Sequence, residues 1–490
     1  MTDIVLVRPN DKQALYNGIP EGATASDPPF YMALIGGFLR DKGYTVKIID
    51  AEAENQEPSQ TANVINEISP NIVGIIPVGS NVGAATWKMH GAGVLAQEIK
   101  NSNSEQLIFM WGYHPSALPE RTLREESIDY VVVGEGFDTM AAMLSMLADG
   151  QKPKGLEGLH RVDGNGKYSG SCLPNLIQNL DELPYTGWEL FDTYKYRNHM
   201  HFAFEDLSKR DRYGVVMTSL GCPYACSYCA IRYFSGDKRV RYKSPQKAAD
   251  EIEYLVKKFN VYYIRIIDEC FTTNKKHLIE VCDAIIERGL DISIWAYARI
   301  DHIDQYILDR MYKAGVRWLG IGIESGSKAI RETVYKGQYD GGDIREKIKM
   351  IRDAGIFVCD NYMFGLPGDN IETMKETLAL AREINCGYPN MYCTMAYPGS
   401  ELYRKYLNEN PSALPDSWLG YAQMSYETKP LPTEFLTSEE VLRFRDYAFN
   451  AFFKNNESYF EMIKSNFGQP AVDAINNMLT GHIKRKLLGE

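Results

Sequence analysis

The sequence predicts an α/β protein in three parts: a doubly wound, Rossmann-like amino-terminal domain, a partial β/α (TIM-like) barrel, and a mainly helical carboxyl-terminal region. In two stretches, residues 1–150 and 213–395, short apolar runs alternate with helical patterns. This alternation is typical of parallel sheets. From Pro398 onward it gives way to helical, aromatic-rich patterns. The expected boundaries are 1–150, a less regular bridge over 151–205, the barrel over 206–396, and 397–490.

The first domain is expected to contain five strands. The apolar runs that predict them are residues 4–7, 46–49, 72–76, 107–111 and 130–133. Open parallel sheets bind ligands at the carboxyl ends of their strands. No GxGxxG follows the first run, so the sequence gives little support to a nicotinamide site. The candidate ligand contacts at these strand ends are Asn10, Gly79, Ser80, Gly112, His114, Gly134 and Glu135.

The barrel is expected to place its active site at the carboxyl mouth of its strands. Its strand-like runs are residues 214–220, 262–267, 293–298, 318–323 and 357–363. A cysteine triplet, Cys222-Pro-Tyr-Ala-Cys226-Ser-Tyr-Cys229, directly follows the first of them. The triplet is therefore expected at the mouth.

Three thiolates at this spacing indicate an iron–sulfur cluster. A four-iron cluster usually takes four cysteines, so a triplet leaves one iron open to a substrate or cofactor. The alternative is a zinc site, which needs a fourth Cys or His at matching spacing, and none is visible. The odd total of nine cysteines also argues against a disulfide framework and for a reducing compartment.

Polar residues at later strand ends suit an amino-acid-like ligand. Asp268 and Glu269 could receive an ammonium group, and Arg299 could pair with a carboxylate. Each also has an ordinary interpretation, as a helix-capping acid or a surface arginine. Glu324, among small residues, could accept hydrogen bonds from ribose hydroxyls. Which of the two neighbouring acids would act is left open.

Composition excludes several classes of function. The net charge of −11 disfavours a nonspecific nucleic-acid binder. No apolar run reaches 18 residues, so no membrane span is expected. The first residues run directly into a strand without a signal-peptide pattern. A cytoplasmic location is therefore expected.

The triplet, with Tyr228 just before its last cysteine, resembles the signature of radical S-adenosylmethionine (SAM) enzymes. The order and spacing of the later motifs match that family over residues 213–395. The resemblance implies that Cys222, Cys226 and Cys229 ligate a [4Fe–4S] cluster. The residues that it implies for SAM binding are Tyr228, Asp268 or Glu269, Arg299, Glu324 and Leu366.

The amino-terminal half resembles the cobalamin-binding domain that is fused to many radical SAM enzymes. Residues 30–39, 112–120 and 128–136 carry this resemblance. The Asp-x-His-x-x-Gly motif of cobalamin mutases is missing, since the nearest match, at His90, lacks the Asp and lies on a helix. His90 is thus interpreted as a surface or packing residue. The resemblance implies that cobalamin contacts the strand-end residues Asn10, Gly79, Ser80, Gly112, His114, Gly134 and Glu135. It is expected to bind without a protein histidine on cobalt.

The resemblance implies a methyltransferase that moves a methyl group from SAM, via methylcobalamin, to an unactivated carbon of a small metabolite or natural-product intermediate. The alternative is cyclisation, ring contraction or rearrangement without methyl transfer. A cobalamin sensor with a relic barrel is a non-enzyme alternative, which the intact triplet disfavours. An electron donor such as flavodoxin or ferredoxin is the expected protein partner. The tail residues expected to cover the barrel mouth are Tyr397, Tyr403, Tyr406, Trp418 and Tyr421.

Overall fold

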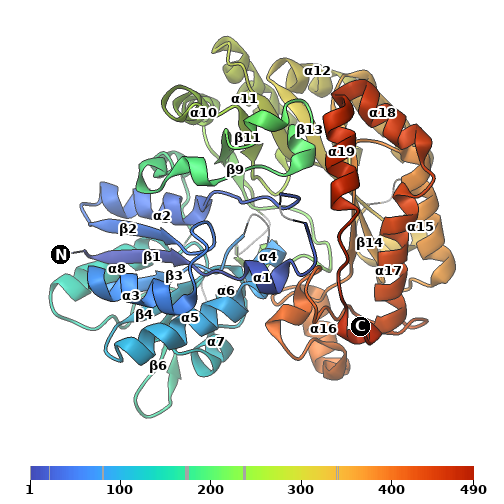
Figure 1. Cartoon of the computed structure of the whole chain (residues 1–490). Helices are drawn as coiled ribbons and strands as arrows, with labels where there is room; N and C mark the ends of the chain where they lie inside the picture. The colour runs from blue at the N-terminus through green and yellow to red at the C-terminus, as the bar shows by residue number, and fades with distance from the viewer. Residues whose placement is uncertain are drawn as a thin grey trace.

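The computed structural model places two parallel sheets side by side, with the carboxyl-terminal helices along the far side of the second sheet (Figure 1). It describes residues 2–20, 22–79, 82–171, 176–234, 239–337, 339 and 341–490, without the side chains of 82–84. Within these residues, no helix is both long and apolar enough to cross a bilayer. The three-part α/β architecture predicted from the sequence is confirmed.

The first sheet has the order β2-β1-β3-β4-β5-β6-β7, and its first five strands are parallel. The strand order reverses between β1 and β3, which is where doubly wound sheets open a ligand crevice. The parallel strands are β1 (Ile4–Arg8), β2 (Val46–Asp50), β3 (Ile72–Ile75), β4 (Ile108–Trp111) and β5 (Tyr130–Val132). The longer helices around them are α2 (Phe30–Asp41), α3 (Pro58–Ile68), α5 (Met89–Ser102) and α8 (Phe137–Ala148).

The bridge contributes to this sheet, which the sequence pattern did not indicate. β6 (Leu159–Val162) pairs antiparallel with β5, and β7 (Tyr168–Ser169) pairs antiparallel with β6. Both strands are short and rich in polar residues, so they lack the apolar run that marks a buried parallel strand. Several short 3-10 turns lie between residues 180 and 203 of the bridge.

The second sheet is an open barrel of six parallel strands in the order β15-β14-β13-β12-β11-β8. Its strands are β8 (Tyr213–Val216), β11 (Tyr263–Ile266), β12 (Ser293–Ala298), β13 (Val316–Glu324), β14 (Phe357–Phe364) and β15 (Tyr388–Cys393). Its helices include α10 (Pro245–Phe259), α11 (Lys275–Glu287), α12 (Gln305–Lys313), α14 (Gly341–Asp353) and α15 (Ile371–Ile384).

The edge strand β15 was not among the predicted strands. It contains Pro389 and Asn390, which are residues of low strand propensity. Proline is tolerated there because one side of an edge strand has no partner strand to which it must donate. The carboxyl-terminal region occupies that side: the Gln423 side chain bonds both the amide and the carbonyl of Cys393, at 2.9 Å each.

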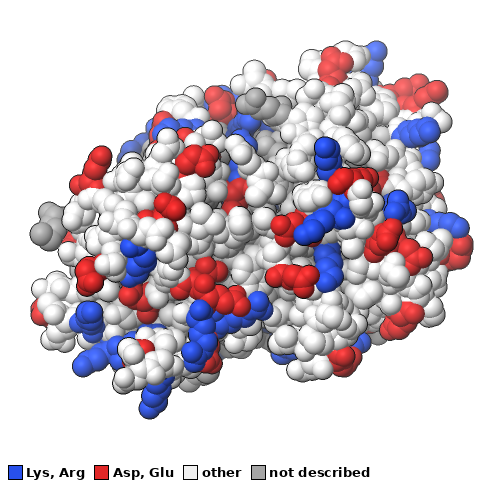
Figure 2. Space-filling view, turned by 60° about the horizontal axis from the view of Figure 1, so that its bottom comes forward, with Lys and Arg blue, Asp and Glu red and all other residues white. Residues whose placement is uncertain are grey.

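The carboxyl-terminal region is helical, as expected. It comprises α16 (Glu401–Glu409), α17 (Ser438–Phe453), α18 (Glu457–Phe467) and α19 (Gln469–Met478), followed by a tail to Glu490. In Figure 1 the last three helices stand beside β14 at the right of the barrel. Acidic and basic side chains intermingle on the face shown in Figure 2. No broad field of one sign covers that face.

Candidate functional site

The three cysteines of the triplet lie in one loop after the short strand β9 (Ser219–Leu220). All three thiols are free and half-buried. Gly221 begins the loop with φ of +106°, and a Cβ there would lie 2.4 Å from the Arg239 carbonyl oxygen. A glycine is therefore required at this position. We call residues 221–229 the cysteine loop.

Burial shifts the pKa of two thiols of the cysteine loop. Burial raises the pKa of Cys222 to about 11 and that of Cys229 to about 12. Such thiols become thiolates when a metal supplies positive charge. In the part of the chain that the structure describes, no three Cys, His, Asp or Glu side chains converge to hold one metal ion. A cluster takes each thiolate on a different iron, so its ligands need not converge.

Asp268 and Glu269 follow β11 and differ in their surroundings. Both Asp268 oxygens are occupied: they accept hydrogen bonds from the Thr218 amide (2.7 Å) and from the hydroxyls of Thr218 and Ser219 (2.6 Å each). Glu269 accepts a hydrogen bond from the Gly221 amide (3.0 Å) and is partly buried. Burial raises the pKa of Glu269 to about 7, and the Asp268 charge raises it further. Asp268 therefore braces the base of the cysteine loop, and Glu269 remains accessible.

Glu324 ends β13 in a left-handed conformation, with φ of +66°. Its carboxylate accepts a hydrogen bond from the Tyr228 hydroxyl (3.0 Å) and pairs with the Lys336 ammonium (3.0 Å). Burial lowers the pKa of Lys336, but the charges of Glu324, Cys226 and Tyr339 together outweigh it, so the pKa is raised overall. The fully buried Leu366 shares a small apolar cluster with Tyr228. The structure thus brings Tyr228, Glu324 and Leu366 together beside the cysteine loop.

Arg299 reaches the same region from the end of β12. Asp301 binds its Nε and Nη2 (3.0 and 2.8 Å), and the Lys336 carbonyl also accepts from Nη2 (3.2 Å). Its guanidinium lies over the Tyr224 ring, 3.8 Å from the centroid. Arg299 is therefore next to both the cysteine loop and the Glu324 site.

The candidate residues of the first sheet lie along its carboxyl edge, but several are already engaged. Asn10 donates to the Gln56 carbonyl (3.2 Å). Glu135 pairs with Arg241 of the barrel domain and accepts from the Ile177 amide (2.8 Å), so it joins the two domains. Gly79 lines a cavity between the first sheet and the barrel. Ser80 lies outside the described residues.

Gly112 and Gly134 both adopt positive φ, at +144° and +63°. His114, which follows Gly112, is buried. Its Nδ1 lies 3.3 Å from the Thr86 hydroxyl, and its ring packs edge-on against Trp418. Burial lowers the pKa of His114 to about 3, so the ring is neutral. His90 is exposed on α5, in agreement with its interpretation as a surface residue.

The two domains meet through an aromatic contact that no sequence motif predicted. The hydroxyls of Tyr31 and Tyr113, both in the first domain, are hydrogen-bonded at 2.8 Å. Tyr113 packs on Phe234, which closely follows the cysteine loop, with centroids 4.2 Å apart. The carboxyl edge of the first sheet therefore faces the cysteine loop.

A cavity of about 570 Å³ lies between this edge and the barrel interior. Arg8 and Gly79 line it from the first sheet, and Arg265, Tyr297 and Asn361 line it from the barrel strands. Its volume is within the usual range for small-molecule sites. No sequence pattern predicts this cavity, because its walls come from strands, loops and a tail that are remote from one another along the chain.

The aromatic residues of the tail lie at the domain junction. Tyr397, Tyr403, Tyr406, Trp418 and Tyr421 belong to one apolar cluster with Tyr228 and Leu118. Trp87 of the first domain packs edge-on against Tyr397. These side chains thus pack between Tyr228 and the first domain.

Two family models match the chain. One is described as the radical SAM superfamily and matches residues 216–381; the other is described as the B12 binding domain and matches residues 27–144. Among curated proteins, the chain is 31% identical over 451 residues to the uncharacterized methyltransferase PH0819 of Pyrococcus horikoshii, with 92% of each chain covered. It is 27% identical over 385 residues to an anaerobic magnesium-protoporphyrin IX monomethyl ester cyclase of Rubrivivax gelatinosus, covering 77% of this chain and 66% of the relative.

Among solved structures, the chain resembles the radical SAM methyltransferase TsrM from Kitasatospora setae, solved with cobalamin and a [4Fe–4S] cluster bound. The TM-score is 0.68 at 16% identity, over 93% of this chain and 90% of that one. At this identity the likeness concerns the fold.

Proposed function

The chain belongs to the B12-binding radical SAM family, and from this premise we propose that it is a cobalamin-dependent methyltransferase. The reaction moves a methyl group from SAM, by way of cobalamin, to an unactivated carbon of a small molecule. The observation that carries the proposal is three free, half-buried thiols beside a buried Tyr228–Glu324–Lys336 site, all facing the carboxyl edge of the first sheet. The domains proposed for it are 1–150, 151–205, 206–396 and 397–490.

For the barrel, we assign Cys222, Cys226 and Cys229 to a [4Fe–4S] cluster and the neighbouring polar groups to SAM. Bound together, cluster and SAM supply a 5′-deoxyadenosyl radical, and cobalamin supplies a methyl carrier. Glu269, rather than the fully engaged Asp268, receives the SAM ammonium. Glu324 accepts the ribose hydroxyls.

The remaining SAM contacts use groups left available by the fold. Arg299 binds the SAM carboxylate with Nη1, which has no protein partner among the described residues. The partly buried Tyr228 ring faces the adenine, and Leu366 packs behind it in the same apolar cluster and so helps to seat the adenine.

In the first domain, cobalamin lies along the carboxyl edge of the sheet. Gly79 lines the cavity at this edge, and Gly112 and Gly134 adopt positive φ where the chain turns at the strand ends. His90 is exposed on α5 and His114 is enclosed by protein, so neither is assigned to cobalt. The substrate occupies the cavity beside Gly79, and flavodoxin or ferredoxin supplies the electron.

The second candidate function is a radical cyclisation without net methyl transfer. The observation that favours it is the likeness to the cyclase of Rubrivivax gelatinosus, which extends over 77% of this chain. Both functions use the same cluster and SAM site. They differ in whether a methyl group enters the product.

Anaerobic incubation of the reconstituted enzyme with methyl-labelled SAM, reductant and candidate substrates separates the two. A methyltransferase places label in the product, whereas a cyclase releases 5′-deoxyadenosine and an unlabelled product. The Cys226→Ala variant serves as the control and is expected to form no 5′-deoxyadenosine. If that variant still forms it, the cluster assignment is wrong.

A further inference from the structure

Tyr224, in the first spacer of the cysteine loop, is bound at two points by the segment after β12. The Arg299 guanidinium covers its ring at 3.8 Å from the centroid. Its hydroxyl is hydrogen-bonded to Nε2 of His302. We call Tyr224, Arg299 and His302 the Tyr224 clasp. No sequence motif pointed to Tyr224 or His302.

Both side chains that bind Tyr224 are themselves fixed. Nδ1 of His302 bonds the Thr272 hydroxyl (3.1 Å), whose oxygen also accepts from the Arg299 amide (3.2 Å). Both ring nitrogens are thus engaged, and the plane of the imidazole is set. Asp301 binds one edge of the Arg299 guanidinium at two points, which leaves its face free to stack.

The clasp joins segments from two strand ends to the loop between the first two cysteines. Thr272 follows β11, and Arg299 and His302 follow β12. A cation over an aromatic ring is attracted to it, and more strongly where water is excluded. Tyr224 and His302 are only partly buried. The clasp therefore lies between the cysteine loop and solvent.

We propose that His302 is a positioning residue which, through Tyr224, fixes the first spacer of the cysteine loop and keeps the Arg299 cation beside it. This inference rests on the proposed cluster site. Hydrogen bonds, nearby charge and solvent exposure set the reduction potential of an iron–sulfur cluster. A cation beside the cluster stabilises its reduced, more negative form, so loosening the clasp lowers the potential.

The test uses the full chain, reconstituted anaerobically with iron and sulfide, and two measurements that need no substrate. One is the midpoint potential from an EPR-monitored titration, and the other is the rate of iron release to a chelator. His302→Phe is expected to lower the potential and to release iron about ten-fold faster than wild type. His302→Gln keeps a side-chain donor. It is therefore expected to have a midpoint potential and a rate of iron release close to those of wild type.

Tyr224→Phe separates the hydrogen bond from the stacking, because it removes only the hydroxyl. Tyr224→Phe is expected to lower the potential and to speed iron release as much as His302→Phe does. The double variant is expected to show the same potential and the same rate of iron release as either single variant. His90→Phe, at an exposed site on α5, is the matched control and should leave both readouts unchanged. If His302→Phe fails to fold, Tyr224→Phe and His302→Gln still decide the question.

The outcomes are distinct. A wild-type protein that holds no cluster contradicts the proposed function. A wild type that holds a cluster, with potential and iron release unchanged in Tyr224→Phe and His302→Phe, overturns the positioning role alone. The same holds if His302→Gln behaves like His302→Phe.

Discussion

Neighbouring acidic residues at this site have different roles. Asp268 and Glu269 are adjacent in sequence, yet Asp268 is buried and accepts three hydrogen bonds from Thr218 and Ser219, whereas Glu269 is only partly buried. Both residues follow the end of β11, and different donors reach them: Thr218 and Ser219 bond Asp268, whereas the Gly221 amide bonds Glu269. Because both side chains are carboxylates, their chemistry alone does not tell which of them is available to a ligand.

Glu269 gives the first prediction, a pH dependence of SAM binding. Its pKa of about 7, raised by burial, means that the carboxylate is protonated below that pH. Because an ionised carboxylate binds an ammonium more strongly than a neutral acid does, SAM affinity should rise about ten-fold between pH 6 and 8. Anaerobic titration calorimetry measures the SAM affinity at each pH. Glu269→Gln should bind more weakly with no such rise, and a rise preserved in that variant would contradict the assignment.

Asp11 gives a second prediction, for stability. It is 4% exposed, its carboxylate lies against Gly91 of α5, and its Oδ2 has no partner in the described structure. Burial raises its pKa to about 7 from 3.8. Between these values the folded state binds more protons than the unfolded state, so stability falls as pH rises.

Asp11→Asn removes this titration. We expect it to be about 1–2 kcal/mol more stable than wild type at pH 8, and close to wild type at pH 4. Urea unfolding at both pH values measures the difference. A variant that is less stable than wild type at pH 8 would show that the attraction of Asp11 to Lys88 outweighs the burial cost.

At the scale of elements, the edge of the barrel is completed by side chains rather than by another strand. Gln423 replaces a neighbouring strand at Cys393, and Arg445 of α17 donates to the Met391 carbonyl (2.8 Å). Exposed strand edges favour wrong pairing between chains, and covering them prevents it. The carboxyl-terminal region thus covers the free edge of β15, where the barrel ends.

The third prediction concerns this edge. Gln423→Ala leaves two buried backbone groups of Cys393 without partners, which should lower the free energy of unfolding by about 2–3 kcal/mol. Gln423→Glu keeps an acceptor for the Cys393 amide and should lose less. Chemical denaturation of the two variants provides the comparison. Equal stability of Gln423→Ala and wild type would mean that water replaces both bonds.

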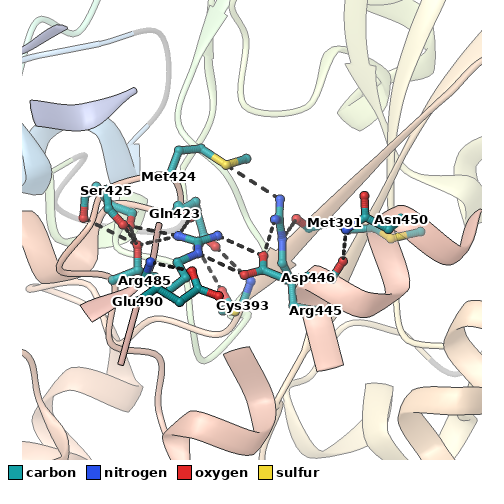
Figure 3. A network of polar contacts seen from close by, with 12 residues as sticks. Met391, Cys393, Gln423, Met424, Ser425, Arg445, Asp446, Asn450, Arg485 and Glu490 are labelled. Atoms are coloured by element: carbon teal, nitrogen blue, oxygen red, sulfur yellow. Dashed lines mark hydrogen bonds and ion pairs between the residues drawn. The ribbon is translucent and has the colours of Figure 1, made fainter. Parts of the chain in front are cut away.

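At the scale of the whole molecule, the tail closes the structure over the cavity. Arg485 is 1% exposed and bonds both oxygens of Asp446 (2.9 Å each) as well as the Gln423 carbonyl and the Thr428 hydroxyl (2.9 Å each). Figure 3 shows its guanidinium between Gln423, Ser425 and Asp446, with Glu490 close by. The tail before it meets the amino-terminal loop, since a Cβ on Gly18 would lie 1.9 Å from the His482 carbonyl oxygen.

The fourth prediction tests this anchor. Arg485→Ala leaves Asp446, three-quarters buried, without the guanidinium that lowers its pKa against burial. We expect a loss of about 3 kcal/mol in stability and faster proteolysis of the tail near His482. Limited proteolysis with mass spectrometry locates the cuts.

Lys484→Ala, at the exposed neighbouring position, should stay within about 0.5 kcal/mol of wild type. If the tail of Arg485→Ala resists protease as wild type does, the tail is anchored by its apolar contacts instead.

The sequence by itself determined the chemistry and the class of fold. Three cysteines at this spacing lie in one loop, and apolar periodicity is a local property of the chain. Both can therefore be recognised from the sequence alone. Strands with long apolar runs were found within a few residues of their bounds. The polar strands β6 and β7 and the edge strand β15 were not, because partners elsewhere in the chain stabilise them.

Only the tertiary structure decided how these local signals combine. It separated Asp268 from Glu269, assigned Glu135 to an ion pair between domains, and brought His302 onto Tyr224 from 78 residues away along the chain. It also assembled a cavity whose walls come from both ends of the chain. The physical reason is that contacts between remote residues depend on how the sheets and the tail pack, which local sequence pattern does not encode.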